Sequence, residues 1–420
     1  MSGRRRIMTK SFRKLTDKKM VNALVFLCAA VYFVSYVTRI NYSAVLVEIM
    51  KSEGYTKTAV SVPVTGLFIV YGASQLISGY LGDKISPEKI VFSGLIISAL
   101  MNLFLPFAPS TKVMTVIWSI NGFAQALMWP PLVKILTEYL SIENYSKNIV
   151  YIIFGSSLGT VFVYTASPVV IGISSWKWVF FGASAVAVTV AVVWIFSIYR
   201  IERGGAQVQE DSSSEKIQAK SSHVSFTTAA IMLLGMIMFT NVFQGLLRDG
   251  ISTWMPTYMA DTFGFGSQSA ILTGVALPVA SMFISFFTAA LYRKILKNEA
   301  VCTTLFFVVC TACCFVLCMS GDVSPVLSAV MLMAASAATH AINFMYTSIA
   351  VAKFERFGRM SLVTGLINSS VYIGSALSTY GIAAVAEHFG WHGTLVTWLI
   401  CSVLGFAGCI ASIKPFSKNL

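Results

Sequence analysis

Long stretches without charge constrain this chain more than any other feature of its sequence. Residues 90–108, 176–198, 300–319 and 393–413 are each about 20 residues long and almost free of charge, the length of helix that spans a ~30 Å hydrocarbon core. Overall, 56% of residues are hydrophobic and only 11% are charged, whereas soluble domains contain about 25% charged residues. Backbone groups inside lipid must be hydrogen-bonded within their own segment. The sequence therefore predicts an all-α protein that crosses a membrane repeatedly.

Twelve such segments divide into two sets of six. The first set covers residues 22–49, 58–80, 90–108, 113–135, 148–172 and 176–199, and the second covers 225–259, 268–291, 300–319, 325–352, 361–385 and 393–413. Between them, residues 200–224 are rich in charge and serine, so this stretch is expected to be a flexible cytoplasmic linker. The expected organisation is one six-helix bundle with a basic tail over 1–199 and a second over 225–420.

The basic residues are distributed unevenly between the loops. With a cytoplasmic N-terminus, 24 of the 30 Lys and Arg residues fall on the cytoplasmic side and only Lys51, Lys57, Lys112 and Lys177 fall outside. This positive-inside bias places both termini of a multi-pass cell-membrane protein in the cytoplasm. The net charge of +13 thus reflects topology, and no nucleic-acid partner is expected.

Three local patterns resemble a signal peptide, a redox or metal-binding cysteine pair, and a histidine metal site. The N-terminus is basic and then apolar, as in a signal peptide, but the apolar segment is too long and lacks a cleavage site, so we expect a retained first helix. Cys310 and Cys313 have redox or metal spacing, yet they lie in an apolar span without a second pair, which favours ordinary packing. His388 and His392 lack a supporting pattern of acids, so no metal site is expected.

The two sets of helices are related by an internal repeat. A shift of 209 residues brings Arg39 onto Arg248, and the same shift brings Lys84 onto Arg293. Parallel six-helix repeats, related by an axis along the membrane normal, place a substrate site between the halves near the midplane. The sequence therefore predicts two pseudo-symmetric bundles with a central site.

Arg39 is the most informative single residue. It lies 20 residues after Lys19 and 12 before Lys51, too deep in the first helix to reach either surface easily. An arginine at such depth costs about 3 kcal/mol on insertion scales, so it normally faces a polar cavity or a counter-charge. Tyr32 and Tyr36 share its helical face. We expect these three side chains to contact substrate.

Arg248 occupies the matching place in the seventh helix. Asn241 and Gln244 lie on its helical face, at i and i+3 with the arginine at i+7. Packed across the axis, Arg39 and Arg248 would aim two planar guanidinium groups at one volume, and such groups bind phosphate or carboxylate bidentately. Weaker polar stripes elsewhere, such as Tyr372 with Ser375, are more typical of interhelical hydrogen bonding.

The alternative for each arginine is structural pairing with an acid. Asp249 follows Arg248 directly, but neighbouring side chains on a helix point about 100° apart. Glu48 lies near the outer end of the first helix, on roughly the face opposite Arg39. Neither acid is therefore expected to pair within its own helix, although an acid from another helix remains an alternative. Asp249 and His340 are candidate proton carriers.

Four segments resemble known families. Gly79-Tyr80-Leu81-Gly82-Asp83-Lys84 is similar to the loop signature of the major facilitator superfamily. Tyr36-x-x-Arg39-x-Asn41, residues 121–131 and Arg248-x-Gly250-x-x-x-Trp254-x-Pro256-x-Tyr258 are similar to its organophosphate:phosphate antiporter family, which includes glycerol-3-phosphate and hexose-phosphate transporters. The likeness covers nearly the whole chain. It implies the twelve-helix alternating-access fold, phosphate held by Arg39 and Arg248, and a conformational role for Gly79, Asp83 and Lys84.

The sequence also departs from that family. Tyr71-Gly72-Ala73-Ser74-Gln75 stands where the family has Tyr-Gly-x-Ser-Lys, so a neutral amide replaces a site lysine. The resemblance therefore adds Tyr71 and Gln75 to the expected substrate-binding set, with less positive charge, which admits a substrate of lower charge. The Tyr36-x-x-Arg39 segment also resembles the anion:cation symporters of the same superfamily.

The expected function is secondary transport of an organic anion, a phosphorylated metabolite exchanged for inorganic phosphate. Burying two unpaired positive charges is costly, and a dianion neutralises them. The alternatives are proton-coupled symport of a carboxylate or sugar acid, and a transporter-like membrane sensor of a phosphorylated ligand. No constellation for catalysis, metal or cofactor is found, so an enzyme is not expected. The expected partners are a small anion and the lipid bilayer, with the protein acting as a monomer.

Overall fold

The computed structural model describes residues 14–204, 227–296, 298–351, 354 and 360–419, and within these ranges the chain is helical almost throughout. The first half contains α1 (Lys18–Glu53), α2 (Lys57–Lys84), α3 (Pro87–Phe104), η1 (Leu105–Phe107), α4 (Thr111–Ala126), α5 (Trp129–Tyr139), α6 (Ile142–Ile173) and α7 (Trp176–Gly204). The second contains α9 (Thr228–Phe263), α10 (Ser267–Thr273), α11 (Ala276–Leu291), η2 (Tyr292–Leu296), α12 (Glu299–Ser320), α13 (Pro325–Phe344), η3 (Met345–Ile349) and α14 (Met360–Asn419).

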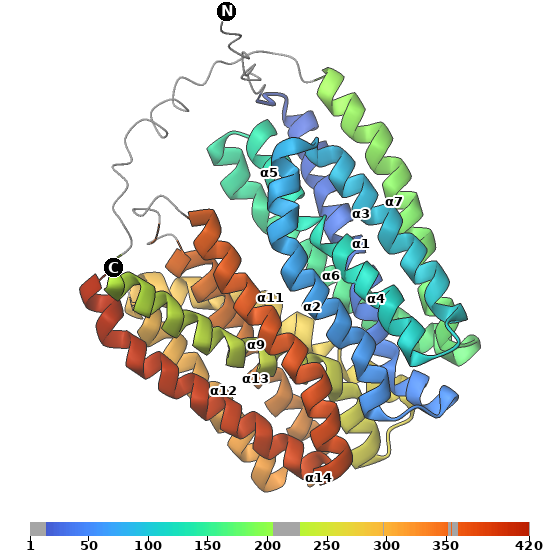
Figure 1. Cartoon of the computed structure of the whole chain (residues 1–420), viewed down its shortest axis with the longest axis vertical. Helices are drawn as coiled ribbons and strands as arrows, with labels where there is room; N and C mark the ends of the chain where they lie inside the picture. Colours follow the sequence, from blue (N-terminus) through green and yellow to red (C-terminus); the bar gives the residue numbers. More distant parts are fainter. Residues whose placement is uncertain (1–13, 205–226, 297, 352–353, 355–359, 420) are drawn as a thin grey trace, which may run out of the picture.

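The helices form two bundles that lie side by side. Figure 1 shows α1 to α7, coloured blue to green, in one bundle and α9 to α14, yellow-green to red, in the other. We call the end at which α7 finishes and α9 begins the linker end, and the end near Glu53 and Phe263 the far end. The contact surface between the bundles is the seam.

Twelve crossings are made by the described helices, although not every crossing is one continuous helix. Nine described helices are long and apolar enough to span a membrane, among them α14, whose apolar stretch covers 51 residues from Val363 to Ile413. This helix crosses twice, because Gly390 has a non-helical backbone with φ 67° and reverses the chain. The other two crossings are α2 and the pair α4–α5.

Several helix boundaries differ from the expected spans; the span predicted over 268–291, for example, is divided into α10 and α11. The span predicted over 113–135 is broken between α4 and α5, where prolines occupy the first turn of α5 and cannot continue the ladder of the preceding helix. At the end of the first half, α7 continues to Gly204, five residues past the expected end at residue 199. The predicted linker lies outside the described residues from 205 onward, so its role stays a prediction.

The internal repeat is visible in the two helices that carry the arginines. Both α1 and α9 have 36 residues, and each ends at a glycine in the left-handed region, Gly54 and Gly264, with φ 69°. Each packs against a glycine of a partner helix. A Cβ on Gly159 of α6 would lie 2.5 Å from the Phe33 carbonyl oxygen, and one on Gly374 of α14 would lie 1.9 Å from that of Val242. Because glycine has no side chain, the helix backbones can approach closely at these two points, and this contact fixes the positions of α1 and α9.

The hydrophobic packing shared by the two halves lies toward the far end. One large cluster of buried side chains contains residues of both halves, and its members from the first half fall within 42–67, 105–118 and 176–180. A second cluster, drawn from the first half alone, lies toward the linker end and covers parts of residues 15–34, 91–99, 128–152 and 187–201. Nearer the linker end, the rings of Phe154 and Phe286 stack across the seam with centroids 5.7 Å apart.

Polar contacts also join the halves at the far end. Lys57 Nζ lies 2.9 Å from Asp261 Oδ2, and the backbone N–H of Thr58 donates to Glu387 Oε1 at 2.9 Å. The Thr58 hydroxyl donates to the other carboxylate oxygen of Glu387. The two halves are therefore joined at the far end of the seam by charged and apolar contacts together.

Candidate functional site

The rotation of α1 is set by amides from α3 and α4. Gln125 donates to the Thr38 hydroxyl at 2.9 Å, while Asn102 and Asn121 donate to the Thr38 carbonyl oxygen at 3.0 and 2.9 Å. All four residues are buried. Because successive side chains on a helix differ by about 100°, holding Thr38 against α3 and α4 directs the next residue, Arg39, away from them.

Arg39 is surrounded by aromatic rings rather than by acids. Its guanidinium carbon lies 4.2 Å from the ring centroid of Tyr36 and 5.4 Å from that of Tyr71, within the range of cation–π attraction. Its buried Nε atom has no hydrogen-bond partner. Among the described residues, no carboxylate oxygen lies within 4.0 Å of this side chain. Its positive charge is therefore not neutralised by a described acid.

Arg248 is paired, and the expectation that Asp249 would point away from it is wrong. Arg248 Nε donates to Asp249 Oδ1 at 3.0 Å, and Nη2 donates to Oδ2 at 2.8 Å. The 100° between neighbouring positions describes where the Cβ atoms point, and the long arginine stem folds back far enough to bridge them. The side chains of Arg248 and Asp249 retain 13% and 16% exposure, so solvent still reaches a small part of this pair.

Residues of α14 complete the polar surroundings of that pair. The Ser375 hydroxyl donates to Asp249 Oδ2, as expected for a residue assigned to interhelical hydrogen bonding. The Tyr372 ring lies edge-on to Tyr71 of the other half, with centroids 4.6 Å apart. Sequence analysis assigned Tyr372, with Ser375, to a weaker polar stripe and did not include it in the site.

A chain of neighbouring side chains connects the two arginines. Arg39 lies over the Tyr71 ring of α2, and that ring packs against Tyr372 of α14. One turn further along α14, Ser375 donates to Asp249, the partner of Arg248. We refer to the following residues, contributed by four helices of both halves, as the central cluster: Tyr36, Arg39, Tyr71, Arg248, Asp249, Tyr372 and Ser375. This arrangement agrees with the two arginine-bearing stripes converging on one region of the seam.

The other residues expected on the helical faces of the two arginines lie at the edge of the central cluster or behind it. They are Tyr32, Asn241 and Gln244. Tyr32 packs edge-on to Tyr36, with centroids 5.3 Å apart, and against Trp129 at 4.5 Å. Asn241 and Gln244 have no exposed surface, and Gln244 donates to the Thr339 carbonyl oxygen of α13 at 3.0 Å. Both retain buried amide atoms without a hydrogen-bond partner. Their contact with substrate stays a prediction.

Three other sequence predictions concern α2 and α13. Gln75 is half-buried, one turn beyond Tyr71 on α2. His340 lies on α13 directly after Thr339, whose carbonyl oxygen accepts from Gln244 of α9. The motif residues Gly79, Asp83 and Lys84 fall at the linker end of α2, but their side chains lie outside the described residues.

Sequence reasoning also missed the amide network beneath Arg39. Asn121 and Gln125 entered only as part of a segment that resembles a family, and Thr38 and Asn102 were not singled out. The available signal was a pair of amides at i and i+4 in an otherwise apolar span, because polar groups at membrane depth need partners on another helix.

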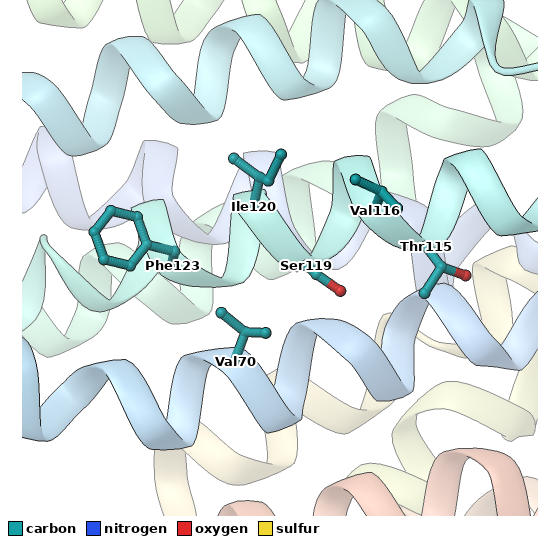
Figure 2. Close-up of a pocket in the computed structure, with 6 residues that line it drawn as sticks. All are labelled: Val70, Thr115, Val116, Ser119, Ile120 and Phe123. Atoms are coloured by element: carbon teal, nitrogen blue, oxygen red, sulfur yellow. The ribbon is translucent and has the colours of Figure 1, made fainter.

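A surface hollow between α2 and α4 does not belong to this site. Its volume is about 450 Å³, and Figure 2 shows it lined by Val70, Thr115, Val116, Ser119, Ile120 and Phe123. No charged side chain lines it, so it is unsuited to an anion. Among the described residues, no group of three His, Cys, Asp or Glu side chains is arranged to hold a metal.

The chain matches a known protein family over most of its length. The family model of the Major Facilitator Superfamily matches residues 28–379. The chain belongs to this superfamily. Its members are transporters rather than enzymes, so the two bundles and the central seam are those of a secondary transporter.

Individual relatives agree with the resemblance seen in the sequence. A probable hexose phosphate transport protein of Chlamydia muridarum is 20% identical over 89% of this chain and 86% of its own length. The glycerol-3-phosphate transporter of Bacillus subtilis is 26% identical over 56% of each chain. In structure, a bacterial homologue of the human lysosomal transporter Spinster, in an inward-facing and occupied conformation, superposes with a TM-score of 0.78 at 14% identity, covering 96% of this chain and 98% of that one.

Proposed function

We propose that this superfamily member carries an organic anion, a phosphorylated metabolite exchanged for inorganic phosphate, by alternating access. The observation that carries the proposal is Arg39, a half-buried arginine in the middle of α1 whose charge no described acid balances. Burying such a charge costs several kcal/mol. An anion that balances it stabilises the closed states through which the carrier must pass, whereas the empty carrier exchanges slowly, and this difference favours exchange.

The direction of access follows from the seam. Lys57, Asp261 and the shared apolar cluster hold the far end together, while Arg248 and Asp249 remain partly exposed. We infer that the route to the central cluster runs toward the linker end, opposite the contacts that join the two halves at the far end. With the basic loops in the cytoplasm, this conformation faces inward, and the protein belongs in the cell membrane with both termini inside.

Exchange and the role of Arg39 are tested together in liposomes. Purified protein is reconstituted into vesicles loaded with phosphate, and uptake of radiolabelled phosphate is measured for wild type, Arg39→Ala and Arg39→Lys. We expect Arg39→Ala to lower uptake about 10- to 100-fold, because a charge-assisted contact contributes roughly 1.5–3 kcal/mol. Lysine is expected to restore little, since it lacks the planar fork. Arg200→Ala, an exposed arginine of α7, is the matched control.

A fully active Arg39→Ala protein would refute this function. Strong phosphate binding without uptake would instead indicate the membrane sensor.

A second candidate, proton-coupled symport of a carboxylate, is favoured by one observation. Asp249 is a carboxylate deep in a spanning helix, hydrogen-bonded to Ser375 and Arg248, and such groups mark proton pathways in transporters. Uptake that needs no internal phosphate and collapses with an uncoupler would support symport. Uptake that persists with the uncoupler but requires internal phosphate would exclude it.

A further inference from the structure

The pairing of Arg248 leaves the central cluster with a smaller charge than two arginines alone would give. Arg39 contributes one positive charge, and Arg248 and Asp249 cancel each other through two hydrogen bonds of 3.0 and 2.8 Å. Gln75, one turn beyond Tyr71 on the same face of α2, is neutral. The central cluster therefore carries a formal net charge of about +1 rather than +2.

The pair also occupies one of the two bidentate edges of Arg248, the side formed by Nε and Nη2. A guanidinium binds carboxylate or phosphate bidentately through two parallel N–H groups, and Nε and Nη2 of Arg248 already donate to the two oxygens of Asp249. The Ser375 hydroxyl donates to Oδ2 from α14, so the carboxylate is held from two helices. An incoming anion therefore cannot bind bidentately to Nε and Nη2 of Arg248, because the carboxylate of Asp249 already does so.

From these contacts we propose that Asp249 is a built-in counter-ion that makes the site selective for anions with one negative charge. This inference rests on the proposed function, in which Arg39 is the principal anion ligand. A monoanion brings the cluster to neutrality. A dianion leaves one uncompensated negative charge beside Asp249, and an unbalanced buried charge is strongly unfavourable.

The substrate class that fits is an organic monoanion. A phosphodiester, a sulfonate or a monocarboxylate carries one charge at every physiological pH. A phosphate monoester, whose second pKa is about 6, fits only in its singly protonated form. Inorganic phosphate likewise enters as the monoanion.

The test compares two probes of similar size and different charge. Dimethyl phosphate carries one negative charge at pH 8, whereas methyl phosphate is mainly a dianion at that pH. Each is titrated as an inhibitor of radiolabelled phosphate uptake into phosphate-loaded proteoliposomes. For wild type we expect the inhibition constant of dimethyl phosphate to be lower by about tenfold or more, because close charge pairs contribute 1.5 kcal/mol or more.

Two variants raise the charge of the cluster from different helices. Asp249→Asn removes the counter-ion from α9, and Gln75→Lys adds a positive charge from α2. Both are expected to reverse the preference toward methyl phosphate. Gln75→Met keeps the charge unchanged and is expected to keep the preference for dimethyl phosphate. If Asp249→Asn fails to fold, as judged by its size-exclusion profile, Gln75→Lys against Gln75→Met carries the test.

The outcomes separate this inference from the proposed function. Wild type that takes up phosphate in an Arg39-dependent manner but prefers methyl phosphate overturns the counter-ion. The same holds if neither charge-changing variant shifts the ratio of the two inhibition constants. Absence of phosphate uptake by wild type, or uptake that survives Arg39→Ala, instead overturns the proposed function.

Discussion

Asp261 at the far end makes two contacts, of which one crosses the seam. Lys57 Nζ lies 2.9 Å from its Oδ2 in the other half, whereas Trp391 Nε1 donates to the same oxygen at 3.0 Å within the second half. The side chains of Lys57 and Asp261 remain 24% and 38% exposed, so solvent screening limits the pair to about 0.2–1 kcal/mol. Asp261→Asn removes the charge but keeps an acceptor for Trp391. We expect it to shift the equilibrium toward the far-end-open state by a factor of roughly 1.4 to 5.

This shift is measurable by hydrogen–deuterium exchange and mass spectrometry of the protein in lipid nanodiscs. Backbone amides near residues 53–60 exchange in proportion to the open population, so Asp261→Asn is expected to accelerate their exchange by the same factor. Glu53→Gln is the matched control, because Glu53 accepts from Trp176 at 3.3 Å within the first half. Exchange of Asp261→Asn at the wild-type rate would show that the contact between Lys57 and Asp261 does not hold the far end together. Equal acceleration by Glu53→Gln would show that the effect is not specific to a contact across the seam.

The remaining predictions concern stability. Arg248→Ala leaves the Asp249 carboxylate buried without its partner, which costs up to about 3–5 kcal/mol. The yield and melting temperature of the folded protein should therefore fall. Adding Asp249→Asn to the Arg248→Ala protein should restore most of both. A double variant as unstable as the single one would contradict the pairing argument. Gly374→Ala puts a Cβ against the Val242 carbonyl oxygen and should cost about 1–3 kcal/mol, whereas Gly381→Ala, with nothing within 4 Å of the added atom, should leave the thermal unfolding curve nearly unchanged.

Much of the fold follows from local sequence because the bilayer sets a length. A helix that crosses a ~30 Å core needs about 20 apolar residues wherever it sits, so the order of the spans and their number were readable without neighbours. The break between α4 and α5 and the extension of α7 to Gly204 depend on where a helix stops, which hydropathy alone does not decide.

The site was predictable to the level of the arginines. Arg39 and Arg248 stood out because an arginine at membrane depth is costly and because the repeat relates them. By contrast, Asn241 and Gln244 share the Arg248 face in sequence but turn out fully buried, with Gln244 bonded to α13. Helical periodicity fixes which residues share a face, but it does not determine which neighbouring helix covers that face.

By itself the sequence determined the twelve-span plan, the two related halves and the depth of both arginines, since each is a property of one segment measured against a bilayer. Only the tertiary structure decided that Arg248 is neutralised by Asp249 while Arg39 is not. That difference depends on a side-chain rotamer, on Ser375 of α14 holding the carboxylate, and on Tyr36 and Tyr71 surrounding Arg39. Contacts between helices distant in sequence thus set the charge of the site, on which the proposed anion selectivity depends.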